Sequence, residues 1–334
     1  MQQHFPSFRD GGDAINKGSA LVWAPALQTW LCGDVEGKIF KKTAGGDFEE
    51  IALLDGVAIS ALAVHPTQEE IMVAADDSIC KRSLTNLDHS LMEQVSRTEV
   101  SFAHMQYDHE GDFLFTAAKD GDVIVLNVQN GQAEQCERIK TDGHPVASLA
   151  LSADSRHIAL VDAEGALFVY RLEFQARPDG RRLVQVDLLT MKNGIVAKQV
   201  ARGKEGCGCS VAFHPTKLLL AVPTDAGVVV LRPSATGKEW EELFMVDAHS
   251  AALNLCAFSP SGEYLASADL TGAVVVWAFD AGQPDASASL RTLDPIEVLQ
   301  DLAWGRGPED NYVVTLSLSD WAQAEAVPAS HLSG

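Results

Sequence analysis

The sequence predicts an all-β protein built from one repeated unit. The clearest unit spans residues 257–277 and reads AFSPSGEYLASADLTGAVVVW, two short apolar runs with a tight polar turn between them. Short apolar runs bounded by Gly, Pro, Asp and Ser are typical of β-strands joined in hairpins. Further copies of the pattern begin at Ala63, Gln106, Ala150 and Ala212, and weaker copies begin at Ala20 and Asp301.

The polar turns inside the units set the period of the repeat. The corresponding turn positions are Gly37, Ser78, Gly121, Gly165, Gly227 and Gly272. They are separated by 41, 43, 44, 62 and 45 residues. A period of roughly 40–45 residues with four strands per unit is typical of WD-type β-propeller blades. Glycine suits such turns because they need a positive φ, so we expect the turn at Ser78 to be strained or differently shaped.

The length of the chain fits a seven-bladed WD-type β-propeller, with about 48 residues per blade. The seventh unit has strand-like runs at 298–304 and 312–318 but a poor third strand. We expect an N-terminal strand, around residues 4–10, to complete this blade and close the ring, which removes open sheet edges. No Pro-, Gly- or Ser-rich linker divides the chain, so we expect one propeller domain over residues 1–321 and a flexible tail over residues 322–334.

Cysteine usage and the absence of a secretion signal indicate a reducing compartment. The six cysteines are scattered, mostly one per unit and within strand-like runs, where free thiols behave as small hydrophobes. No Asn-x-Ser/Thr acceptor, basic-then-apolar leader or membrane-length apolar run occurs. We therefore expect a nuclear protein, or alternatively a cytoplasmic one, that does not bind membranes.

The charge distribution points to one segment of the chain. The formal net charge is −21, which makes direct DNA binding by this domain weak or absent, because such binding needs Lys and Arg on phosphates. The segment 171–205 has eight basic and four acidic residues, which leaves −25 on the remainder. This segment lies within the 62-residue spacing between Gly165 and Gly227. Long loops on rigid scaffolds often bind partners, although a solvated loop without a ligand is the alternative.

We divide the insertion into a turn that begins at Arg177, a strand that begins at Leu183 and a loop that begins at Lys192. The loop leads toward the next inner strand, so we expect it on the face around the channel mouth. Arg177, Arg181 and Arg182 should emerge on the opposite face. The candidate partner-binding residues are Lys192, Lys198, Arg202 and Lys204, and the ligand that suits them is an acidic peptide or a short nucleic-acid segment.

No catalytic constellation is present in the sequence. The phosphate-binding loop, the Gly-x-Ser-x-Gly elbow and the His-Glu-x-x-His helix are all missing. Cys207 and Cys209 are one residue apart without a second pair, which is a weak zinc signal, so we expect no metal and no cofactor. A propeller enzyme would need His, Asp or Glu at the inner strand starts, where the sequence has Leu, Ala and Val. We therefore predict that the chain is not an enzyme.

Two histidines precede an inner strand, where WD repeats place a histidine that bonds to Ser or Thr, Asp and Trp of its own blade. The sixth unit supplies His249, Ser267 and Trp277, with Thr271 at the position we expect for the Asp. The fourth unit supplies His144, Glu164 and Tyr170, but Leu160 stands at the position where a Ser or Thr hydroxyl is expected. We expect each of these two units to form a partial, buried hydrogen-bond network that stabilises its own blade. His65 and His214 precede prolines and are expected to serve their turns.

Residues 218–277 resemble the N-terminal propeller of the eukaryotic replisome adaptor family. That family includes the chromosome transmission fidelity adaptor of fungi and the acidic nucleoplasmic DNA-binding protein of animals. The matching residues are Leu220 to Pro223, Arg232, Trp240, Phe244, Leu253, Asn254, Ser259 to Ala266, and Trp277. The resemblance implies a protein-interaction scaffold at replicating or segregating chromosomes. The alternative is a WD adaptor of a translation, checkpoint or ubiquitin-ligase complex.

Overall fold

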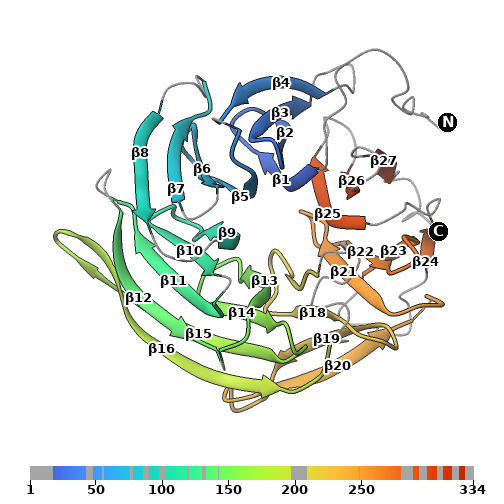
Figure 1. Ribbon diagram of the computed structural model, residues 1–334. Helices are drawn as coiled ribbons and strands as arrows, with labels where there is room; N and C mark the ends of the chain where they lie inside the picture. The colour runs from blue at the N-terminus through green and yellow to red at the C-terminus, as the bar shows by residue number, and fades with distance from the viewer. Residues whose placement is uncertain are drawn as a thin grey trace.

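The repeated apolar runs form β-strands, and consecutive strands pair antiparallel into small sheets. The computed structural model describes residues 18–42, 48–54, 56–75, 78–85, 90–97, 102–118, 120–129, 133–141, 143–196, 209–247, 249–279, 289–292, 299–306, 311–317 and 323–327. In these residues the sheets follow one another around a central axis, which makes an all-β propeller (Figure 1). The first strand of each sheet lies innermost and the last lies at the rim.

Each blade is a meander of strands in chain order. The first blade contains β1 (Gly18–Ala24), β2 (Thr29–Asp34), β3 (Lys38–Lys42) and β4 (Phe48–Leu53). The second contains β5 (Ile59–Val64), β6 (Glu70–Ala75), β7 (Ser78–Ser83) and β8 (Ser90–Arg97). The third contains β9 (Phe102–Tyr107), β10 (Phe113–Ala118), β11 (Asp122–Asn127) and β12 (Glu134–Lys140). The fourth blade contains β13 (Val146–Leu151), β14 (His157–Asp162), β15 (Leu167–Arg177) and β16 (Gly180–Lys192). The fifth contains β17 (Ala212–Phe213), β18 (Leu220–Pro223), β19 (Val228–Pro233) and β20 (Trp240–Val246). The sixth contains β21 (Leu253–Phe258), β22 (Tyr264–Asp269), β23 (Val274–Ala278) and β24 (Ser289–Thr292). The last sheet contains β25 (Leu299–Arg306), β26 (Asn311–Ser317) and β27 (Gln323–Val327).

The ring has six complete blades among the described residues, not the seven that the sequence predicts, because the last sheet has three strands. Residues 4–10, the predicted closing strand, lie outside the described residues. The last sheet meets the first, since β1 contacts β25 and β26 and Ala303 packs against Trp30. Within the predicted tail, the residues of β27 pair with β26 through their backbone.

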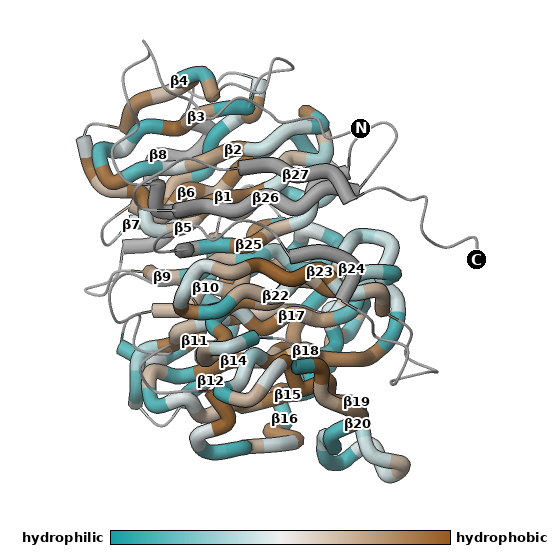
Figure 2. Tube along the Cα trace, turned by 90° about the vertical axis from the view of Figure 1, so that its right-hand side faces the viewer, coloured by the Kyte–Doolittle hydropathy of each residue, from teal (hydrophilic) through white to brown (hydrophobic). Residues whose placement is uncertain are grey.

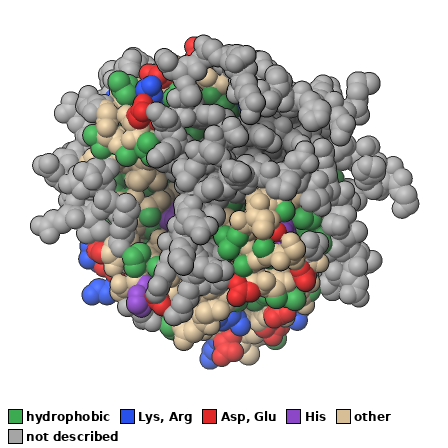
Figure 3. Space-filling model, turned by 45° about the vertical axis from the view of Figure 1, so that its right-hand side comes forward, with side chains coloured by type: hydrophobic (Ala, Val, Ile, Leu, Met, Phe, Trp, Pro, Cys, Tyr) green, Lys and Arg blue, Asp and Glu red, His purple; other side chains and the backbone are tan. Residues whose placement is uncertain are grey.

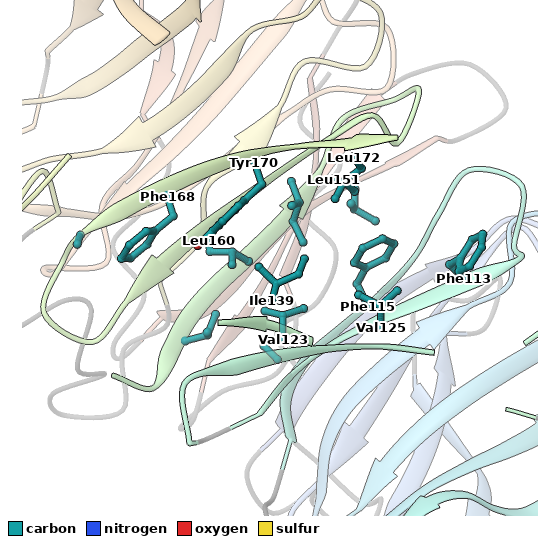
Figure 4. Packing of buried hydrophobic residues seen from close by; sticks show 14 residues of the cluster. Phe113, Phe115, Val123, Val125, Ile139, Leu151, Leu160, Phe168, Tyr170 and Leu172 are labelled. Carbon is teal, nitrogen blue, oxygen red and sulfur yellow. The ribbon is translucent and has the colours of Figure 1, made fainter. Parts of the chain in front are cut away.

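The middle strands are buried on both faces because neighbouring blades pack against them. All six residues of β10 and of β22 are buried, whereas six of the seven residues of the rim strand β12 are exposed. Hydrophobic residues accordingly concentrate in the strands and hydrophilic residues in the loops (Figure 2). Between the third and fourth blades, Phe115 and Leu160 belong to one buried cluster (Figure 4). Each such side chain contributes about 1.5–3 kcal/mol by its burial.

The repeat turns have the conformation that glycine permits. Gly121 has φ +100° and Gly165 has φ +79°, and a β-carbon on either would meet a carbonyl oxygen, of His144 or Val196. Ser78 has no positive φ, unlike the glycines at the other turn positions, so its backbone conformation differs from theirs, as the sequence predicts. Ala75 pairs directly with Ser78 across residues 76 and 77, and the Ser78 hydroxyl donates to the Ala75 carbonyl at 3.0 Å. Ser78 therefore needs no positive φ.

Two buried histidines join neighbouring blades as well as serving their own turns. His65 Nδ1 accepts from the backbone N–H of Gln68 at 3.0 Å, and its ring lies against Gly111 of the third blade. His214 makes the same contacts, with Lys217 N–H at 3.0 Å and the Gly262 carbonyl of the sixth blade at 3.1 Å. Burial lowers the pKa of both imidazoles, which favours their neutral form.

Candidate protein-binding surface

The insertion in the fourth blade is a hairpin much longer than the strands around it. β15 has 11 residues and β16 has 13, roughly twice the usual strand length. They pair from Leu167 with Lys192 to Arg177 with Gly180, so Pro178 and Asp179 form the tip. The predicted turn and strand are therefore confirmed, with the strand starting at Gly180. Figure 1 shows the hairpin running past its own blade along β12.

Arg181 fastens the hairpin to the third blade. Its Nη1 lies 2.7 Å from a carboxylate oxygen of Asp108, 2.7 Å from one of Glu110 and 3.3 Å from one of Asp112. Its guanidinium carbon lies 4.5 Å from the centroid of the Phe174 ring, which suits a cation–π contact. Burial alone would lower the pKa of Arg181, but the hydrogen bond and charge of Asp108 hold it above its usual value.

The three arginines near the hairpin tip are therefore not equivalent, although the sequence pattern predicts a single group. The Arg181 side chain is only 17% exposed, whereas Arg182 is 54% exposed and pairs with Asp179, which is 60% exposed. Arg177 is also exposed. Arg181 has a structural role that its position in the run of basic residues does not reveal. On the described surface in Figure 3, acidic and basic side chains lie side by side rather than in one patch.

Lys192 lies at the opposite end of β16 from Arg181, half-buried and paired with Leu167. A strand of this length spans roughly 40 Å, so the two ends of the hairpin present separate surfaces. Lys198, Arg202 and Lys204 lie outside the described residues. Lys192 is thus the one member of the candidate set that the described part of the chain contains.

Both ends of the segment that follows Lys192 are anchored in the core. Val196 is 1% exposed and Cys209 is 8% exposed, and both belong to the cluster between the fourth and fifth blades. The Val196 N–H donates to the Gly165 carbonyl at 3.2 Å. Burial raises the pKa of the Cys209 thiol to about 12, so Cys209 stays protonated and packs as a small hydrophobe. Residues 197–208 therefore connect two fixed points on the propeller.

The sixth blade brings the predicted His249, Ser267 and Trp277 together. His249 Nε2 lies 2.8 Å from the Ser267 hydroxyl, which also accepts a hydrogen bond from Trp277 Nε1 at 2.9 Å. His249 Nδ1 lies 3.0 Å from Asp269 Oδ2, and both of these side chains are 1% exposed. The network ties the loop before β21 to β22 and β23. Its position inside the blade indicates a structural role.

The acid that bonds to His249 is Asp269, not the residue at position 271 where the sequence pattern predicts it. Asp269 Oδ1 accepts hydrogen bonds from the N–H groups of Thr271 and Ala273 at 2.9 and 3.2 Å and from the Thr271 hydroxyl. The carboxylate thus caps the turn with one oxygen and binds His249 with the other. The signal for it was the recurring Asp-x-x-Gly turn, because Asp34 and Asp162 cap their turns in the same way.

The network predicted for the fourth blade does not hold its histidine inside the blade. His144 is exposed, and the Tyr170 hydroxyl donates to the Lys140 carbonyl at 3.1 Å. Leu160 is fully buried among apolar neighbours, so no hydroxyl is available to bond a histidine at that position. A histidine without that partner gains nothing from burial and stays in solvent.

The comparisons with known proteins agree with this geometry. Residues 240–278, from β20 to the end of β23, match the family model "WD domain, G-beta repeat". The chain carries a WD40 repeat. It is also 24% identical over 231 residues to "WD repeat and HMG-box DNA-binding protein 1" of Homo sapiens, which covers 67% of this chain and 17% of that protein. The Mus musculus protein of the same name is 28% identical over 189 residues, with 55% and 15% covered. The chain thus spans less than a fifth of the curated relatives that it matches.

The described residues give no direct indication of a membrane or metal site. They contain no helix that is long and apolar enough to cross a membrane. No three His, Cys, Asp or Glu side chains within the described ranges are grouped so that they could hold a metal ion.

Proposed function

We propose that this chain is a non-enzymatic protein-interaction scaffold that acts in the nucleus at replicating chromosomes. The observation that carries the proposal is the insertion in the fourth blade. It adds a segment rich in basic residues to an acidic chain, and the flanking residues Val196 and Cys209 are packed in the core. A rigid scaffold that presents a charged loop favours binding over catalysis.

The WD40 repeat and the two relatives support the nuclear part of the proposal. WD40 propellers present many loops on a rigid ring, which suits them to hold several proteins at once. The relatives are named for WD repeats, an HMG box and DNA binding. The resemblance of residues 218–277 to the replisome adaptor family points to the same cellular process.

Affinity purification of the full-length gene product with mass spectrometry tests this function. Polymerase and helicase subunits in the eluate are expected for an adaptor at replicating chromosomes. Recovery of translation, checkpoint or ubiquitin-ligase subunits instead would assign the chain to a different WD adaptor class. A propeller that retains no protein at all would contradict the scaffold function.

We further propose that Lys192, Lys198, Arg202 and Lys204 bind an acidic peptide segment of the partner. Reversal of all four charges to Glu should abolish this binding, and moderate salt should weaken it in the parent protein, because screening shortens to about 10 Å at 0.1 M. The matched control reverses Arg177 and Arg182, which are exposed at the far end of the hairpin, and leaves Arg181 in place. Retention of every partner by the loop variant would refute this assignment.

The same domain should bind duplex DNA only weakly at physiological salt, because the rest of the chain carries −25. A fluorescence titration with labelled duplex measures this directly. Tight binding that resists salt would contradict the assignment of the loop to an acidic protein segment.

We also propose that residues 4–10 add an outer strand to the three-stranded sheet of β25 to β27. Deletion of residues 1–10 should then cost several kcal/mol of unfolding free energy, because ladder bonds and apolar burial are lost together. Thermal unfolding of the truncated chain measures this loss. An unchanged melting temperature would show that another segment, or none, covers the edge of β27.

A further inference from the structure

The outer side of β16 is an exposed sheet edge with apolar side chains. β16 is the last strand of its four-stranded sheet, so no strand among the described residues pairs with its outer side (Figure 1). The exposed fractions of Val184, Leu188 and Met191 on this strand are 50%, 51% and 41%. Single exposed apolar side chains are normal on a protein surface. Three of them on one long edge strand form a template on which another strand can pair.

Two of these side chains lie on the same face of the sheet. Leu188 is opposite Tyr170 and Met191 is opposite Phe168, and both aromatic residues belong to the cluster that faces the third blade. Residues that are directly opposite each other in an antiparallel pair share a face. The bulge at Leu189 makes this arrangement possible, because in a regular strand residues three apart point to opposite faces. Leu188 and Met191 therefore form an apolar strip beside the edge.

Part of the edge has the regular geometry that strand pairing needs. Residues 185–188 pair with consecutive residues of β15, between the bulges at Val184 and Leu189. A regular stretch presents its outward N–H and C=O groups at the spacing of a β-ladder. An extended segment of a partner can therefore pair with residues 185–188 and pack its side chains on Leu188.

The charges of the rim strands favour an acidic segment at this edge. Each of β4, β12 and β20 exposes two glutamates, whereas no acidic residue of β16 is exposed. Asp187 is partly buried, and Arg171 at 2.7 Å compensates its charge. A bulge interrupts all four of these strands, so bulges do not distinguish them. Among the rim strands whose side chains the structure describes, β16 is therefore the one that an acidic segment approaches without meeting exposed carboxylates.

We propose that β16 binds an extended acidic segment of a partner protein as an added strand of the fourth blade. Main-chain hydrogen bonds hold the segment, its apolar side chains pack on Leu188 and Met191, and its acidic residues meet Lys192 at the end of the strand. An antiparallel arrangement, the more stable of the two, places the acidic residues at the N-terminal end of the segment. The inference rests on the proposed function, in which Lys192 binds an acidic peptide, and adds the conformation of that peptide and a second contact for it.

Hydrogen–deuterium exchange with synthetic peptides tests the added strand. The probe is acetyl-Asp-Glu-Asp-Val-Thr-Val-Thr-Val-amide. Its control has proline in place of the second Val and the second Thr, which keeps the charge and removes two N–H donors. The probe should slow amide exchange saturably in residues 185–188 and leave β12 unchanged, and the proline peptide should bind more weakly and slow nothing. Equal binding of both peptides would refute the added strand alone, because an acidic peptide would still bind the basic residues. Binding of neither would contradict the proposed acidic ligand as well.

Two substitutions on rim strands form a matched pair. Leu188→Thr keeps a residue that favours strands but removes the apolar side chain, so it should weaken the probe peptide about threefold. Met245→Thr changes a side chain of similar exposure, 44%, on β20, which exposes two glutamates, and should leave the affinity unchanged. Equal affinities of the two variants would refute the contact with β16. Sedimentation velocity of the protein alone gives a second readout. A dimer that Leu188→Thr abolishes would assign the edge to a second copy of this chain and overturn the proposal.

Discussion

The fourth and sixth blades share one strand pattern but are stabilised by different polar contacts. In the sixth, His249, Ser267 and Trp277 are linked to Asp269 inside the blade. In the fourth, that histidine is exposed and the blade instead extends its outer hairpin onto its neighbour through Arg181. The sixth blade is thus held within itself, and the fourth is held to the third.

This difference indicates that the apolar strands define the blade and that the polar network can be replaced. The middle strand β14 of the fourth blade is as well buried as β22 of the sixth, apart from His157 at its start. A blade that relies on a contact with its neighbour can change its outer edge without loss of its core. The fourth blade, whose outer edge is the long hairpin, fits this pattern.

Asp269→Ala should have the largest effect, because it removes the acceptor of His249 and the cap of the turn together. We expect a loss of about 2–4 kcal/mol in unfolding free energy, since His249 and three turn donors lose their partner. His249→Ala should cost about 1–3 kcal/mol and leave partner binding intact. Urea denaturation measures both.

Asp162→Ala in the fourth blade is the matched control for Asp269→Ala. Its carboxylate caps the turn through the N–H groups of Glu164 and Ala166, but His144 is exposed in that blade. The loss should therefore be smaller than that of Asp269→Ala. Equal losses would show that the turn cap alone, without the histidine, accounts for the stability of the sixth blade.

Arg181→Ala should release the hairpin from the third blade at a cost of about 1–3 kcal/mol, because the buried Asp108 carboxylate loses its cation. Protease sensitivity at the hairpin tip should rise in parallel. Arg182→Ala should change neither quantity measurably, since its pair with Asp179 is exposed. If both variants behave alike, the hairpin is held by backbone pairing and not by Arg181.

The fold could be predicted from the sequence because each unit repeats the same apolar runs and turns at a steady period. The details that escaped prediction depend on contacts between units. Arg181 looks like any other arginine in a basic turn until Asp108, 73 positions earlier, is placed beside it. Asp269 was missed because the acid was sought at Thr271, two residues too late, and the sequence alone does not show which turn position faces His249. The strand β27 was missed because its residues are short or polar, and its pairing with β26 overrides their weak preference.

The smallest expected effect is the contribution of any single buried histidine to the pH dependence of stability. Burial lowers the pKa of His65, His104, His157 and His214. The unfolded chain, in which a histidine has a pKa of about 6.5, therefore binds more protons than the folded chain below that pH. Stability should be fully present above about pH 6.5 and should fall as the pH drops, by up to about 1.4 kcal/mol per pH unit for each histidine.

Two acids, Asp301 and Asp34, oppose this trend at lower pH, because burial raises the pKa of each. Burial raises the pKa of Asp301 to about 6, so below that pH the folded chain takes up a proton that the unfolded chain does not, which adds stability. The test therefore compares pH 7.5 with pH 6.0 by urea denaturation. His214→Asn, whose amide oxygen can still accept from the turn, should make the slope shallower. An identical slope in the variant would show that His214 binds the same number of protons in the folded and unfolded states. Its hydrogen bond with the Gly262 carbonyl would then contribute equally to stability at both pH values.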